Sequence, residues 1–125
     1  MIVEDEPEIV AALQFMLEQE GHRVSTAANG AQALALLGVQ PPNPAAKLPD
    51  LILMDIMMPV LSGQQACLRL AESPHAKSVP IVILTGNCTT PGAIAKIPNV
   101  KGFVKKPCDS KKIRAAVDAA LREFL

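Results

Sequence analysis

The stretch Leu51-Ile52-Leu53-Met54-Asp55-Ile56-Met57-Met58-Pro59 decides the fold. Its first four residues are apolar, one carboxylate follows, and three more apolar residues run into a proline. A continuous apolar run of this length is typical of a strand buried on both faces, as in a parallel sheet. Asp55 then lies where the strand ends, and it is either a turn residue or a reactive group at the edge of the sheet.

The rest of the chain alternates strands with helices around this stretch. Apolar and β-branched segments predict the other strands, and apolar residues at helical spacing predict the helices. The strand segments are 2–3, 23–27, 80–86 and 102–104. The helical segments are 7–21, 31–37, 64–70, 93–97 and 110 to the end of the chain, with Ser110 as the expected cap of the last helix.

This alternation predicts an α/β fold, a five-stranded parallel doubly wound sheet with helices on both faces. Strand order 2-1-3-4-5 is a common arrangement of such a sheet, and it makes the first and third strands neighbours. Two segments depart from regularity. Four prolines between residues 40 and 49 predict a surface loop, and Pro91 and Pro98 predict a short or distorted fourth helix.

Composition excludes several functional classes. The 125 residues suit one domain, and 50% of them are hydrophobic, enough for a core without disulfides. The 12 basic and 12 acidic side chains give no net charge, which argues against contact with nucleic acid or a membrane surface. Three scattered cysteines without a CxxC pair indicate reduced thiols in a cytoplasmic protein. No apolar run is long enough to span a bilayer.

Polar residues follow the predicted strands at the edge where ligands bind in such sheets. Glu4 and Asp5 follow the first strand, and strand order brings them to Asp55. Carboxylates in contact repel one another by roughly 4 kcal/mol per pair at 4 Å and an effective dielectric near 20, so they need cations. Lys106 supplies one positive charge, and an oxygen-only donor set fits Mg²⁺ better than Zn²⁺. With the hydroxyl of Thr85, these groups are the parts needed to accept a phosphoryl group on Asp55.

Four segments in order along the chain together resemble the receiver domain of two-component response regulators. They are Glu4-Asp5-Glu6-Pro7, residues 53–59 with Gly63, Ile83-Leu84-Thr85-Gly86 and Phe103-Val104-Lys105-Lys106-Pro107. The resemblance covers the whole chain and implies a flavodoxin-like fold. It also implies a single receiver domain over residues 1–125, with no output domain in the chain.

The resemblance implies a role for each matching residue. Asp55 would be the phosphoacceptor, fed by a phosphohistidine on a histidine kinase or histidine phosphotransfer protein. Mg²⁺, or Mn²⁺ in its place, would bind Asp5, Asp55 and the backbone carbonyl of Met57 directly, and Glu4 through water. The remaining roles are phosphoryl contacts by Thr85 and Lys106, a switch aromatic at Phe103, and a cis peptide before Pro107.

The implied function is a phosphorylatable switch and not an enzyme, although such a domain assists its own phosphorylation and dephosphorylation. The change of conformation would pass to an output domain, another protein or a second copy. Two alternatives stay open. One is a pseudo-receiver, an interaction module that is not phosphorylated. The other is an aspartyl-nucleophile phosphatase, which usually carries a second Asp two residues after the nucleophile, where this chain has Met57.

Overall fold

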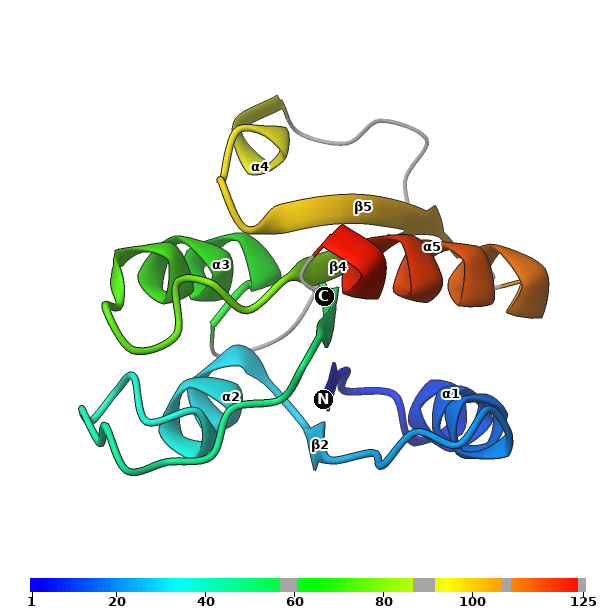
Figure 1. The fold of residues 1–125 in the computed structure, drawn as a ribbon, viewed down its shortest axis with the longest axis horizontal. Helices are drawn as coiled ribbons and strands as arrows, with labels where there is room; N and C mark the ends of the chain where they lie inside the picture. The colour runs from blue at the N-terminus through cyan, green and yellow to red at the C-terminus, as the bar shows by residue number, and fades with distance from the viewer. Residues whose placement is uncertain (57–60, 87–91, 107–108, 124–125) are drawn as a thin grey trace.

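A computed structural model of the chain describes residues 1–56, 61–86, 92–106 and 109–123 (Figure 1). Strands and helices alternate from one end of the chain to the other. The strands are β1 (Ile2–Val3), β2 (Thr26–Ala27), β3 (Ile52–Asp55), β4 (Ile81–Thr85) and β5 (Val100–Lys105). The helices are α1 (Pro7–Gln19), α2 (Gly30–Leu36), α3 (Gly63–Glu72), α4 (Gly92–Ala95) and α5 (Ser110–Glu123).

The five strands form one sheet in the order β2-β1-β3-β4-β5, and every neighbouring pair is parallel. This confirms the predicted fold and strand order. Val3 pairs with Met54, and Asp55 pairs with Leu84. The residues that follow β1 and β3 therefore meet at one edge of the sheet, which we call the carboxyl edge.

Helices cover both faces of the sheet, and β3 contributes to both cores. Figure 1 shows α2, α3 and α4 on one side and α1 and α5 on the other. Ile52 and Met54 face the first group, whereas Leu53 packs with α1 and α5. All four residues of β3 are buried. The two-sided burial is the physical reason for the unbroken apolar run in the sequence.

Local hydrogen bonds set where the helices begin. The Asn29 side chain accepts from the backbone N–H of Gln32 at 2.8 Å, which caps α2. Ser62 and Gln65 form a capping box at α3. The prediction that Ser110 caps α5 is wrong by one residue. Lys111 N–H donates to Asp109 Oδ1 at 2.8 Å, because Asp109 lies just before the helix and Ser110 is already its first residue.

The two predicted irregular segments are confirmed. Helix α4 has only four residues, as the neighbouring prolines predict, and Ile94 within it is fully buried. The proline-rich loop lies before β3, at the end of the sheet opposite the carboxyl edge. Arg69 of α3 donates to Gln40 Oε1 at 2.7 Å and so ties this loop to α3. Strand β2 is shorter than predicted, since only its last two residues pair with β1.

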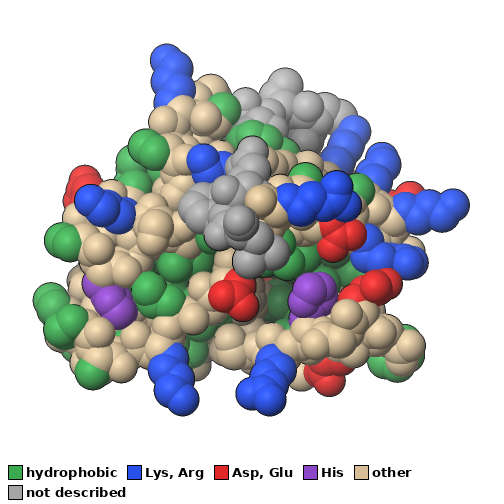
Figure 2. Space-filling model, viewed as in Figure 1, with side chains coloured by type: hydrophobic (Ala, Val, Ile, Leu, Met, Phe, Trp, Pro, Cys, Tyr) green, Lys and Arg blue, Asp and Glu red, His purple; other side chains and the backbone are tan. Residues whose placement is uncertain are grey.

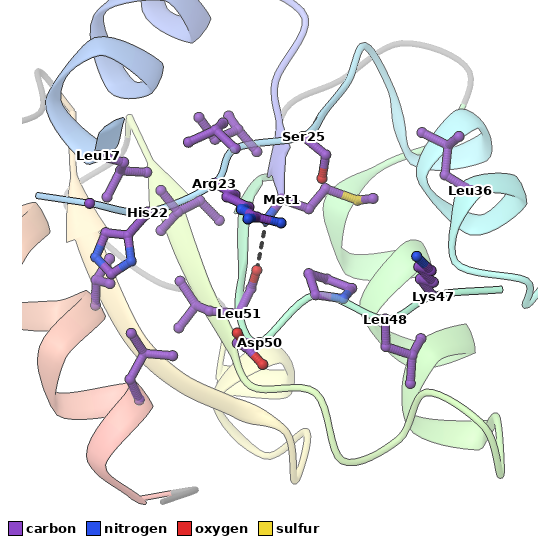
Figure 3. A pocket seen from close by; sticks show the side chains of 17 residues that line it. Met1, Leu17, His22, Arg23, Ser25, Leu36, Lys47, Leu48, Asp50 and Leu51 are labelled. Carbon is purple, nitrogen blue, oxygen red and sulfur yellow. Dashed lines mark hydrogen bonds between the residues drawn. The ribbon is translucent and has the colours of Figure 1, made fainter. Parts of the chain in front are cut away.

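A cavity of about 690 Å³ opens at the amino ends of the strands (Figure 3). Most of the side chains that line it are apolar, and its labelled polar side chains include His22, Arg23, Lys47 and Asp50. The amine of Met1 donates to the carbonyl of Leu51 at 2.8 Å within it. The cavity is at the far end of β1 and β3 from the carboxyl edge. No helix within the described residues is long and apolar enough to cross a membrane.

Cys67 of α3 is completely buried in the core beneath α2 and α3. Burial raises the pKa of its thiol from 9.0 to about 12, which lowers the thiolate fraction at neutral pH about 1000-fold. We expect Cys67 in the folded protein to resist iodoacetamide at pH 8 and to react at the ordinary rate after unfolding in guanidinium. Peptide mass spectrometry of Cys67 alone measures both rates, and rapid native modification would contradict the prediction.

Candidate functional site

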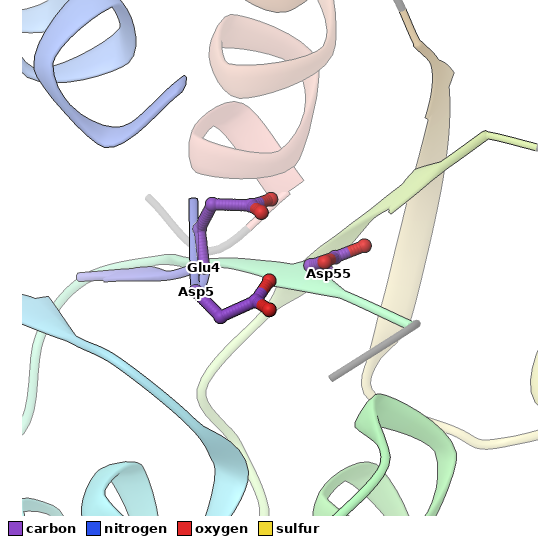
Figure 4. Close-up of side chains that lie close together, drawn as sticks. All are labelled: Glu4, Asp5 and Asp55. Atoms are coloured by element: carbon purple, nitrogen blue, oxygen red, sulfur yellow. The ribbon is translucent and has the colours of Figure 1, made fainter. Parts of the chain in front are cut away.

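Three carboxylates meet at the carboxyl edge (Figure 4). Glu4 and Asp5 follow β1, and Asp55 is the last residue of β3. One oxygen from each lies within 4.8 Å of the others. Glu4 and Asp55 are only 1% and 2% exposed, whereas Asp5 is exposed. The first and third strands are neighbours in the sheet, and this adjacency is what brings acids 50 residues apart into one cluster.

Lys106 contacts two of the three acids. Its Nζ atom lies 3.0 Å from Glu4 Oε2 and 3.3 Å from Asp55 Oδ1. The backbone places it there, because the N–H of Lys106 donates to the carbonyl of Thr85 at 2.7 Å and continues the pairing of β5 with β4. The preceding residue, Lys105, is exposed.

The buried charges change one another's pKa. Burial raises the pKa of Glu4 above its ordinary 4.5, and the nearby charge of Asp55 adds to this, although attraction to Lys106 opposes it. Burial lowers the pKa of Lys106, but its contacts with Glu4 and Asp55 outweigh burial and hold that pKa above 10.5. The acids therefore keep Lys106 protonated at neutral pH.

The donor set fits a hard divalent cation. With Lys106 protonated and the three acids ionised, the cluster carries three negative charges and one positive charge, a net of two negative charges. Glu4 Oε2 is buried, and the ammonium of Lys106 lies 3.0 Å from it. Glu4 Oε1 accepts one long backbone bond from Glu6 at 3.3 Å. Carboxylate oxygens with unused lone pairs are the ligands that Mg²⁺ prefers.

Thr85 and Phe103 lie on the two strands beyond β3. Thr85 ends β4 and is 6% exposed, one residue past the Leu84 that pairs with Asp55. Phe103 lies on the edge strand β5 and is 38% exposed. Two predicted site residues, Met57 and Pro107, lie outside the described residues.

Gly63 holds the backbone that follows Asp55. Its N–H donates to the carbonyl of Ile56 at 3.0 Å. A Cβ added at Gly63 would overlap the carbonyl oxygen of Asp55 and lie 2.8 Å from Ile56 Cα. Sequence reasoning tied Gly63 to the site only as part of a motif and did not single out Ile56. The close approach of α3 to the end of β3 is the physical reason for the glycine.

The whole chain is similar to known signalling proteins. The family model described as the response regulator receiver domain matches residues 1–118. The chain therefore belongs to the receiver domain family of two-component response regulators.

Two curated relatives and one solved structure illustrate the similarity. Protein PilH of Pseudomonas aeruginosa is 32% identical over 97% of this chain and 95% of PilH. The transcriptional regulatory protein AfsQ1 of Streptomyces coelicolor is 32% identical over 98% of this chain, which spans only 50% of AfsQ1. The receiver domain of sensor histidine kinase PA1611 from Pseudomonas aeruginosa, solved with magnesium in its active site cleft, is 26% identical. Its TM-score is 0.79, and the match covers 96% of this chain and 93% of that one.

Replacing Gly63 by Ala tests the packing at the end of β3. We expect Gly63→Ala to lower the free energy of unfolding by about 1–3 kcal/mol, because the added Cβ forces α3 away from Asp55 and Ile56. Gly86→Ala is the matched control, since a Cβ there meets nothing within 4 Å. Urea denaturation measures both, and equal stability of the two variants would contradict the role of Gly63.

Adding Mg²⁺ tests the acidic cluster. A ligand that binds only the folded state raises its stability, by about 2.7 kcal/mol at a concentration 100 times the dissociation constant. We expect Mg²⁺ to raise the melting temperature of the native chain, and Asp5→Asn to remove most of this rise. Asp50→Asn, which removes an exposed carboxylate at the other end of β3, should leave it intact. A Mg²⁺ effect that survives in Asp5→Asn would place the ion elsewhere.

Proposed function

We propose that this chain is a Mg²⁺-dependent phosphorylatable switch that accepts a phosphoryl group on Asp55. The observation that carries the proposal is the ion pair of Lys106 Nζ with Asp55 Oδ1 at 3.3 Å, inside a cluster that also holds Glu4 and Asp5. Asp55 is a buried carboxylate at a strand end, with the ammonium of Lys106 beside it and the carboxylates of Glu4 and Asp5 close by. This environment suits a nucleophile that attacks phosphorus better than it suits a turn residue.

The donor would be a phosphohistidine on a histidine kinase or a histidine phosphotransfer protein. An oxygen of Asp55 forms a bond to phosphorus while the phosphorus–nitrogen bond of the donor breaks, and its electron pair returns to the imidazole. No general base is needed, because the carboxylate of Asp55 is the nucleophile in its ionised form. The product is an acyl phosphate on Asp55.

Each neighbouring group has a defined task in this transfer. Lys106 offsets charge on the phosphoryl oxygens, and the hydroxyl of Thr85 donates to one of them. Bound Mg²⁺, held by Glu4, Asp5 and Asp55, would offset further negative charge on the transferring group. Mn²⁺ would serve in its place. The roles of Met57 as a backbone ligand and of Pro107 as a cis proline stay predictions, because both residues lie outside the described ranges.

The output of the switch passes through β4 and β5. Once Asp55 carries a phosphoryl group, Thr85 moves toward it and Phe103 turns inward into the space that Thr85 leaves. The half-exposed ring of Phe103 on the edge strand supports this, because it has room to move on the solvent side. The recipient is an output domain or a separate protein, and the work is done in the cytoplasm. The domain is a signalling acceptor that assists its own chemistry, not an enzyme acting on other substrates.

The acceptor role has a direct test. We expect incubation with acetyl phosphate and Mg²⁺ to add one phosphoryl group, measured by intact mass, and Asp55→Asn to abolish the adduct because it removes the nucleophile. Asp118→Asn, an exposed acid on α5, should accept the group as the native chain does. Lys106→Met should slow the transfer at least about 10-fold, which corresponds to 1.4 kcal/mol of lost transition-state stabilisation.

Two other outcomes would replace this proposal. No adduct from acetyl phosphate or from a phosphorylated histidine phosphotransfer protein would leave a pseudo-receiver, an interaction module without phosphorylation. Steady release of inorganic phosphate from many phosphomonoesters would instead identify an aspartyl-nucleophile phosphatase.

A further inference from the structure

The sheet has a gap in its middle, at the amino ends of the strands. β1 lies between β2 and β3 but contains two residues. Toward β2, its last bond runs from Ile2 N–H to the carbonyl of Ser25 at 2.8 Å. Toward β3, the amine of Met1 donates to the carbonyl of Leu51, also at 2.8 Å. Beyond Met1, the segments that lead into β2 and β3 both line the cavity of about 690 Å³, so this cavity continues the line of β1.

The backbone beside this gap carries hydrogen-bonding groups without partners. The N–H groups of Ser25 and Leu51 and the carbonyl of Arg23 form no hydrogen bond within the part of the chain that the structure describes. Leu51 is only 8% exposed, and a buried backbone N–H is nearly always paired in a folded protein. Since Ile2 lies opposite Thr26, a parallel residue two positions earlier would lie opposite Val24. It would donate to Arg23 and accept from Ser25.

Apolar side chains line the gap on both faces of the sheet. Figure 3 shows Leu17 on the opposite side of the cavity from Leu36 and Leu48. Leu17 belongs to the core under α1 and α5, whereas Leu48 packs against the core under α2 and α3. Leu36 is 49% exposed, an unusual degree for a large apolar side chain. Because side chains of an extended segment alternate between the two faces of a sheet, two consecutive apolar residues in the gap would each meet an apolar wall.

The rim of the gap carries an excess of positive charge. Arg23, Lys47 and Asp50 line the cavity and are exposed, and none of them forms an ion pair within the described ranges. In the view of Figure 2, hydrophobic side chains are visible at the centre of the molecule, where Figure 1 places the start of the chain. Charged and histidine side chains surround them. Two positive charges against one negative charge favour an occupant with acids at its outer end.

We propose that this gap binds the carboxyl-terminal tail of another protein as an added strand, parallel to β1 and between β2 and β3. The parallel direction lets one residue opposite Val24 satisfy both unpaired groups of the segment that leads into β2. A chain end is required because Met1 closes the inner end of the gap, and a segment that continued past Met1 would collide with β1. The tail ends in apolar residues, and acids precede them at the level of Arg23 and Lys47.

The affinity for such a tail is expected to be low. A few residues form few hydrogen bonds, and ordering the tail costs conformational entropy, so we expect a dissociation constant of about 0.1–1 mM. The proposal does not depend on phosphorylation of Asp55, because no member of the acidic cluster lines the gap.

A peptide titration followed by NMR of the isotopically labelled chain tests the site. The probe is the peptide acetyl-Asp-Glu-Val-Leu-Val with a free carboxylate. We expect saturable shifts of the amide signals of residues 21–25 and 47–51, with a dissociation constant at or below about 1 mM. The peptide acetyl-Lys-Lys-Val-Leu-Val should bind at least about 3-fold more weakly, because the rim is positive. Absence of shifts at about 5 mM probe, or shifts confined to other segments, would overturn the proposal.

Charge exchange at the rim tests the direction of the preference. Arg23→Glu/Lys47→Glu should bind the lysine peptide more tightly than the acidic one. Lys77→Glu/Lys111→Glu removes as many positive charges at exposed positions that do not line the gap, and it should keep the native preference. The same preference in both variants would contradict the proposed orientation of the tail.

Two further variants test strand pairing in the gap. Ser25→Pro removes an N–H that forms no hydrogen bond in the free chain, so it should weaken binding of the acidic probe about 10-fold and leave the melting temperature nearly unchanged. A chain lengthened by Val-Leu-Val ahead of Met1 should fill the gap with its own strand and bind no free probe. Undiminished binding of the probe to either variant would overturn the proposal.

Discussion

The ammonium of Lys106 between Glu4 and Asp55 is the contact on which the carboxyl edge of the sheet depends. Glu4 and Asp55 have lost their hydration because both are almost fully buried, and the charge of Lys106 offsets this loss and the repulsion between the two carboxylates. The contact closes a ring through three strands, because Glu4 follows β1, Asp55 ends β3 and Lys106 follows β5. The ammonium of Lys106 thus links the central strand β3 to the edge strand β5. Any group that competes with Lys106 for contact with Asp55 also acts on Lys106 itself, the residue that follows β5.

Much of this arrangement could be predicted from the sequence. The run 51–55 is apolar up to its final acid because both faces of β3 are buried, and this signal survives in a single sequence. Acids and a lysine at the ends of parallel strands must share one edge. Strand order brings Asp5 and Asp55 together, and the long side chain of Lys106 reaches Asp55 from β5. The prolines around α4 likewise indicated its short length. What these predictions have in common is that each depends on one element or on the order of elements.

The features that the sequence did not reveal depend on distances between elements. Asp109 and Ser110 are both good capping residues, and only the position of the backbone after β5 decides between them. The demand for a glycine at position 63 arises from the approach of α3 to Asp55, which no local pattern encodes. The ion pair of Arg114 with Glu20 links α5 to the end of α1, and it forms only because both helices pack on the same face of the sheet.

The alternation of side chains along β3 gives the central strand a mechanical role. Ile52 and Met54 belong to one hydrophobic core and Leu53 to the other, so β3 separates the two cores and contributes side chains to both. Asp55 is the last residue of that strand. A displacement of Asp55 along the strand would therefore act on residues that pack in both helical layers. Surfaces on opposite sides of this small domain can in this way respond to one event at its edge.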